Sequence, residues 1–214
     1  TTVEAAADLS SACAGLQGRP PAQGSNEALP LLEAFLPMAS RFALNCAPKE
    51  LTRLLPFLAL NTSSRVAAAA VADVAERRIP LLLQGSHGQR IKPLEAALLL
   101  SGLALARQRS SESVVGLSNL LLNSSVSQLP FSSLTRVASS LALLSVRHEQ
   151  LMLEMAETVV VQHQRALNHL QDVRAMAFAW STLQVRHLEF TTLLRQRAEE
   201  LTTVETNAEL FEAL

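Results

Sequence analysis

Five histidines and two cysteines are the residues of this chain best suited to metal binding or acid–base chemistry. His163 and His169 are six residues apart, which puts them on different faces of a continuous helix. Cys13 and Cys46 are too few and too far apart for a disulfide framework or a zinc site. The sequence contains no HExxH or CxxC motif and no GxSxG nucleophile elbow. We therefore expect no enzyme activity, no cofactor, no metal and no small-molecule substrate.

Arginine is the other residue type with chemical potential, because sixteen of the eighteen basic residues are Arg. Residues 51–198 carry fifteen Lys or Arg against nine Asp or Glu, whereas residues 199–214 carry five Glu and no basic residue. Guanidinium groups suit phosphates, carboxylates and protein interfaces, although a GC-rich genome gives the same bias toward Arg. The net charge of −1 thus conceals a basic body that favours an anionic partner.

A repeat positions some of these arginines. The segment Val146-Arg147-His148 returns 39 residues later as Val185-Arg186-His187. Four apolar residues before it, spaced three, four and three apart on one helical face, return with the same offset: Leu134, Val137, Leu141 and Leu144 as Val173, Met176, Trp180 and Leu183. A copy 40 residues upstream comprises Leu94, Ala97, Ser101, Ala104 and then Ala106-Arg107, and a weaker copy 43 residues before that comprises Leu51, Leu54 and Leu58. In this frame Leu55, Leu98, Ala138 and Ala177 are equivalent, and we expect them where helices approach closely.

A period of 39 to 43 residues with two helices per unit predicts an all-α fold, an α-solenoid of about four helical-hairpin repeats. We assign 47–201 to the repeat array, 1–46 to an irregular N-terminal helical cap with a flexible connector at 17–26, and 202–214 to an acidic C-terminal tail. The predicted helices are 28–46, 50–62, 65–83, 93–109, 112–123, 131–147, 149–165, 169–185 and 187–203. The alternative is a non-repeating bundle whose helices share a period by chance.

Stacked units would bring equivalent turns to one edge, so we predict an RNA-binding ridge there. Its candidates are Arg107, Arg109, Arg147, His148, Arg186 and His187. A second candidate basic patch consists of Arg77, Arg78, Arg90 and Lys92. The competing interpretation is that Arg and His near helix C-termini only offset the helix dipole. Trp180 lies in the apolar frame, where core packing is favoured over base stacking.

The segment Ala-Met-Ala-Phe-Ala-Trp-Ser-Thr-Leu at 175–183 resembles the first helix of octotricopeptide and heptatricopeptide repeats. It is also similar to the repeats that precede RAP domains in FAST-kinase-like proteins. The resemblance covers about residues 90–201 and rests on a pattern of small and large residues; unit length and the lack of a recognisable RAP domain depart from it. It implies RNA binding in mitochondria or plastids, including membership of divergent organellar ribosomes.

From this resemblance we expect a non-catalytic subunit of a large organellar ribonucleoprotein. The expected host is a lineage-specific mitochondrial ribosome in the matrix, where the protein contacts rRNA and neighbouring proteins. The alternative is a protein–protein scaffold in a mitochondrial respiratory or RNA-processing complex, without RNA contact. We expect no membrane insertion, because the longest apolar runs are far shorter than the roughly 20 residues of a membrane span.

Overall fold

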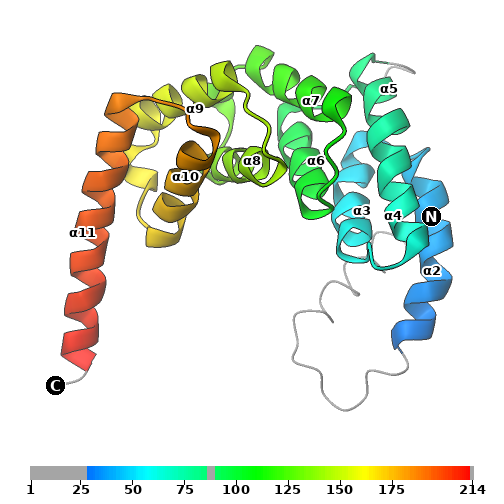
Figure 1. Ribbon diagram of the computed structural model, residues 1–214, viewed down its shortest axis with the longest axis horizontal. Helices are drawn as coiled ribbons and strands as arrows, with labels where there is room; N and C mark the ends of the chain where they lie inside the picture. The colour runs from blue at the N-terminus through cyan, green and yellow to red at the C-terminus, as the bar shows by residue number, and fades with distance from the viewer. Residues whose placement is uncertain (1–27, 86–89, 213–214) are drawn as a thin grey trace. The chain divides into compact units, whose positions relative to one another are not determined.

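The computed structural model describes residues 28–85 and 90–212, and within these ranges its regular secondary structure is helical, without a strand (Figure 1). The α-helices are α2 (Ala28–Ala43), α3 (Pro48–Leu60), α4 (Arg65–Asp73), α5 (Ile79–Leu83), α6 (Pro93–Leu105), α7 (Ser111–Asn123), α8 (Phe131–Leu144), α9 (Glu149–Gln162), α10 (Leu170–Leu183) and α11 (Leu188–Glu212). Shorter segments are η1 (Val74–Arg78), η3 (Val126–Gln128) and η4 (Gln164–Ala166). The predicted all-α class is confirmed. The predicted connector at 17–26 and Cys13 lie outside the described residues.

Each helix predicted between 28 and 203 has a counterpart, with ends that differ by a few residues. The helix predicted at 131–147, for example, ends at Leu144, because the next residues form a turn. The last helix continues to Glu212, so most of the predicted acidic tail is helical. Within the described residues, no helix combines the length and the apolar character that a membrane span requires.

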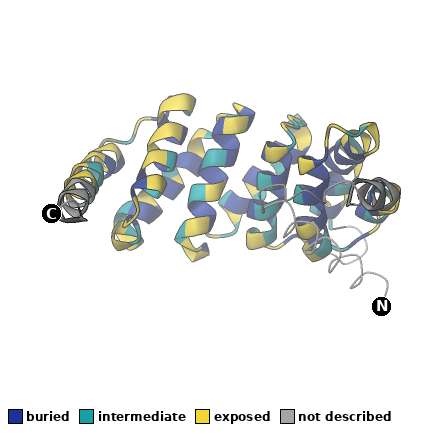
Figure 2. Ribbon diagram, turned by 90° about the horizontal axis from the view of Figure 1, so that it is seen from below, coloured by how far each residue is buried: buried dark blue, intermediate teal, exposed yellow. Residues whose placement is uncertain are grey.

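The chain divides into two compact units, the first ending at Leu117 and the second beginning at Ser118, inside α7. In both units buried residues occupy the faces between helices and exposed residues the outer faces (Figure 2).

In the first unit α3 and α6 begin in the same way, 45 residues apart. Pro48 and Pro93 occupy the first turn, where the missing N–H costs no hydrogen bond. Two residues later Glu50 and Glu95 accept the backbone N–H of the residue before the helix, at 3.0 and 2.9 Å. The offset of 43 predicted between these units is therefore wrong, because the shared helix start fixes it at 45.

Helix α3 packs closely against α6, and α2 packs against α3 and α4. The closest approach is at Gly102 of α6, where an added Cβ would lie 2.8 Å from Cγ of the buried Leu55. Only a residue without a side chain fits this crossing.

One helical stretch, α4 to α5, is interrupted by the π-helical segment η1. Ile79 donates its N–H to Val74, five residues back, and Pro80 has no N–H to donate. The carbonyl of Ala75 therefore loses its usual backbone donor. The buried Ser113 of α7 replaces it by donating its hydroxyl to that carbonyl, which joins α7 to η1.

In the second unit α8 packs against α10, α9 packs against α11, and α10 packs against α11. Helices α8 and α10 each have 14 residues and begin 39 residues apart, and each is followed by a residue with positive φ. The predicted 39-residue offset within this unit thus matches helix lengths and helix ends.

The predicted 40-residue offset between α6 and α8 is wrong. It equates Leu94 with the buried Leu134, yet Leu94 is 48% exposed. An offset of 38 instead equates Ala96, Leu99 and Leu103 of α6 with Leu134, Val137 and Leu141 of α8, all of them buried. In the corrected frame Leu100, and not the half-buried Leu98, is equivalent to Leu55 and Ala138.

Candidate functional site

Three turns, after α6, α8 and α10, share one backbone geometry. In each turn an N–H returns to the carbonyl five residues earlier: Gln108 to Leu103 at 2.9 Å, Val146 to Leu141 at 3.0 Å and Val185 to Trp180 at 3.2 Å. In each turn the residue before that N–H has a left-handed backbone: Arg107 with φ of 53°, Ser145 with 56° and Gln184 with 53°. This Schellman motif satisfies helix-end carbonyls and reverses the chain direction.

A histidine begins the next helix in two of these turns. The Leu151 N–H donates to Nδ1 of His148 at 3.3 Å, and the Phe190 N–H donates to Nδ1 of His187 at 3.2 Å. Because Nδ1 accepts, the ring proton of His148 is on Nε2, which lies 2.9 Å from Oδ1 of Asn119. Both histidines are half-buried, and each caps its helix.

One arginine precedes the helix at the same place in all three turns, two residues after the left-handed position: Arg109, Arg147 and Arg186. All three are exposed. Arg107 was predicted to be equivalent to Arg147, but it occupies the left-handed position that Ser145 has in the next turn. The repeated arginine of the first turn is therefore Arg109.

These arginines differ in their local charge partners. Arg147 forms an ion pair with Glu149 at 3.0 Å on an exposed surface. Within 28–85 and 90–212 neither Arg109 nor Arg186 forms an ion pair. Their charge is accordingly open to an anionic partner.

The second predicted patch has a structural component. Arg78 donates from Nη2 to the Cys46 carbonyl at 2.6 Å, which ties η1 to the turn between α2 and α3. Arg77 pairs with Asp73 at 3.6 Å on the surface. Arg90 and Lys92 are exposed beside the start of α6.

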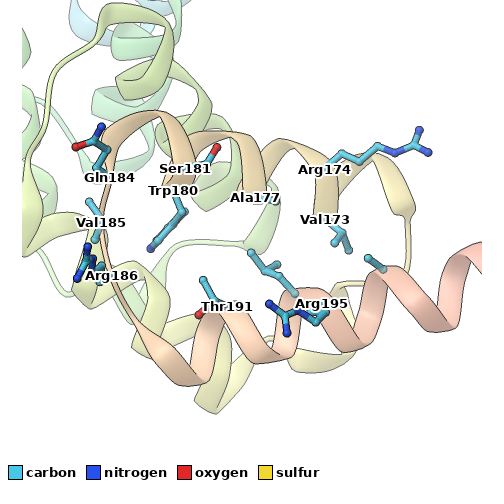
Figure 3. A pocket seen from close by; sticks show the side chains of 12 residues that line it. Val173, Arg174, Ala177, Trp180, Ser181, Gln184, Val185, Arg186, Thr191 and Arg195 are labelled. Atoms are coloured by element: carbon cyan, nitrogen blue, oxygen red, sulfur yellow. The ribbon is translucent and has the colours of Figure 1, made fainter.

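A groove that the sequence did not predict lies between α10 and α11 (Figure 3), with a volume of about 700 Å³. Its apolar surface includes Val173, Trp180, Val185 and Leu194, and its rim carries Arg174, Arg186 and Arg195. None of the lining residues is acidic. The groove thus combines apolar surface with positive charge.

Trp180 is 2% exposed and its ring centroid lies 4.5 Å from that of Phe190, which confirms its predicted place in the core. Its ring nitrogen is buried without a hydrogen-bond partner and is directed toward the turn at Val185 and Arg186 (Figure 3). A buried N–H without an acceptor costs free energy, so this nitrogen is an open donor beside the groove.

The groove is the surface that the preceding hairpin buries. Ala138 and Ala142 of α8 are buried, whereas their equivalents Ala177 and Ser181 of α10 are exposed. The expectation that Ala177 lies where helices approach closely is therefore wrong within the described chain. The sequence signal for this difference is weak, because Arg174 and Arg195 look like solvent-facing residues of ordinary amphipathic helices.

The remaining candidates for chemistry do not cluster. In the part of the chain that the structure describes, no three His, Cys, Asp or Glu side chains are grouped as metal ligands. His163 lies 6.1 Å from Phe131, centroid to centroid, in a tilted ring contact. Burial raises the pKa of the Cys46 thiol to about 11, so this thiol stays protonated near neutral pH.

The chain was also compared with known proteins, and no family model, no curated protein and no solved structure matches it.

Proposed function

We propose that this protein is an α-solenoid without catalytic activity that serves as an RNA-contacting subunit of a large organellar ribonucleoprotein. The proposed host is a mitochondrial ribosome in the matrix, where the protein contacts rRNA and neighbouring proteins. The observation that carries the RNA contact is the repeated turn, in which a Schellman motif and a helix start present an exposed arginine at the same position three times.

The solenoid part of the proposal is supported by the pairing of helices within the second unit. First helices α8 and α10 pack together, and second helices α9 and α11 pack together. That pairing is the one expected when successive hairpins stack in two layers. The 39-residue identity of their turns supports the same arrangement.

Exposed arginines supply phosphate affinity that depends on salt. Each phosphate neutralised in single-stranded nucleic acid contributes roughly 0.7 to the slope of log affinity against log salt. Three contacts from Arg109, Arg147 and Arg186 would contribute about 2 to that slope. The turn arginines position a backbone and carry no base readout, so we expect little sequence preference.

The experiment changes Arg109, Arg147 and Arg186 together to Gln in the full chain. Binding to single-stranded RNA is measured over a range of salt concentrations, and incorporation into the native particle is followed by sedimentation. The matched control changes Arg53, Arg136 and Arg165 to Gln, which removes the same charge from exposed positions outside the turns. We expect the turn variant alone to lose the salt slope of about 2 and to incorporate poorly.

A second candidate function is the protein–protein scaffold, and the open groove between α10 and α11 favours it. Crosslinks from the native assembly decide between the two. Crosslinks to proteins but none to RNA, together with equal RNA binding by both triple variants, would establish the scaffold and reject the RNA contact.

A further inference from the structure

The groove between α10 and α11 has the apolar floor of a helix-docking surface. Equivalent positions on the preceding hairpin, Met155 and Val159 of α9 among them, are fully buried beneath α10 and α11. The groove itself has no helix over it in the described chain, and Ala177 and Ser181 are exposed there. A helix is therefore the shape of occupant that this repeat accepts.

The rim of the groove selects for charge. Arg174, Arg186 and Arg195 are exposed, and no acidic residue lines the groove. A neutral or basic helix would leave three guanidinium groups without partners at its edges. An acidic amphipathic helix matches both the apolar floor and the rim.

Such a helix exists in this chain, at the end of α11. Residues 199–212 include Glu199, Glu200, Glu205, Glu209 and Glu212 and no basic residue. Leu201, Val204, Ala208 and Phe211 follow one another at spacings of three, four and three, which places them on one helical face.

The lengths also agree. Helix α11 has 25 residues, whereas its neighbour α10 has 14, so the acidic half of α11 is additional to the part that borders the groove. The segment 199–212 and α10 both span about 21 Å at the usual rise per residue. The acidic half thus has the length of the groove.

We propose that the groove binds the acidic end of α11 from a second copy of this chain, in a reciprocal two-fold dimer. The two α11 helices run antiparallel, so that residues 191–198 of each copy lie beside 199–212 of the other. A two-fold axis makes the contact twice, which allows two modest grooves to form one interface. The partner's carboxylates approach Arg174 and Arg195 and supply acceptors near the unpaired Trp180 nitrogen. This inference does not depend on the proposed RNA contact.

The test is a charge exchange in the full chain. The groove variant carries Arg174→Glu and Arg195→Glu, and the tail variant carries Glu205→Arg and Glu209→Arg. Mass is measured by sedimentation equilibrium over a concentration series, with emission of Trp180, the sole tryptophan, as a local reporter. Circular dichroism checks that each variant retains its helix content.

We expect the wild type to dimerise and each variant alone to dimerise about tenfold or more weakly, because like charges then face each other. An equimolar mixture of the two variants regains the dimer, since each groove again meets a tail of opposite charge. The control variant, Arg53→Glu with Arg136→Glu, dimerises like the wild type.

Two results would overturn the proposal. One is a wild type that stays monomeric at all concentrations, which would leave the groove for a different partner's helix. The other is a dimer that neither charge variant weakens, which would place the interface elsewhere. Neither result bears on the salt dependence of RNA binding, so this proposal and the proposed function fail independently.

Discussion

At His148 and His187 an imidazole ring does what Ser, Thr, Asp or Asn does at most helix N-termini. Nδ1 accepts a backbone N–H of the first turn in both cases. The sequence repeat Arg-His therefore has two causes, because His caps the helix while the preceding Arg is directed to solvent. Only the arginine remains available to a partner, whereas the histidine has a structural partner already.

The residue-scale prediction concerns this cap. We expect His148→Ala to destabilise the second unit by about 1 kcal/mol, because the Leu151 N–H loses its acceptor. His148→Asn keeps an acceptor and should recover most of that loss. Urea unfolding followed by Trp180 emission measures both variants. Equal stability of the alanine variant and the wild type would show that the ring does not act as a cap.

At the scale of elements, two helical glycines face opposite consequences. At Gly102 of α6 an added Cβ meets Leu55, which is fully buried and cannot move aside. At Gly116 of α7 the nearest atom is a terminal methyl of the half-buried Leu83, at 2.5 Å, which can rotate away. Alanine favours a helix over glycine by about 1 kcal/mol, so the surroundings decide the sign.

We accordingly expect Gly102→Ala to lower the free energy of unfolding by about 1 kcal/mol, since overpacking at α3 outweighs the gain in helix propensity. Gly116→Ala should raise it by up to about 1 kcal/mol. Denaturant titration followed by circular dichroism distinguishes the two. A stabilising Gly102→Ala would mean that α3 and α6 are less closely packed than the structure indicates.

At the scale of the whole molecule, composition gives this protein a simple alkaline titration. The chain has no Tyr and few Lys, so few side chains lose a proton between pH 9 and 11. Burial raises the pKa of the Cys46 thiol from 9.0 to about 11 in the folded state. In that interval the unfolded chain releases the thiol proton and the folded chain keeps it.

Stability should therefore be unaffected by this thiol below pH 9 and should fall as the pH rises from 9 to about 11. The loss approaches about 2 to 3 kcal/mol, in line with the size of the pKa shift. Urea unfolding at several alkaline pH values measures it. Cys46→Ala is the control, because the fall attributable to this thiol must vanish in it, and an unchanged pH profile would assign the effect to other groups.

The sequence by itself determined the class of the fold and the positions of nearly all helices. Apolar spacing of three and four residues identifies the helices, and proline, serine and asparagine mark their ends. It also revealed the Arg147 and Arg186 equivalence, because side-chain identity and offset agree there. These features are local, so they are written in neighbouring residues.

Tertiary structure decided the register of the earlier units and the location of the groove. Helix α6 is apolar nearly all round, so periodicity selects no face, and only burial against α3 sets its offset from α8 at 38. Likewise Ala138 and Ala177 are the same residue type in the same frame. One is buried because α10 covers it, and the other is exposed because no helix of the described chain does, a difference that depends on neighbours and not on the residue itself.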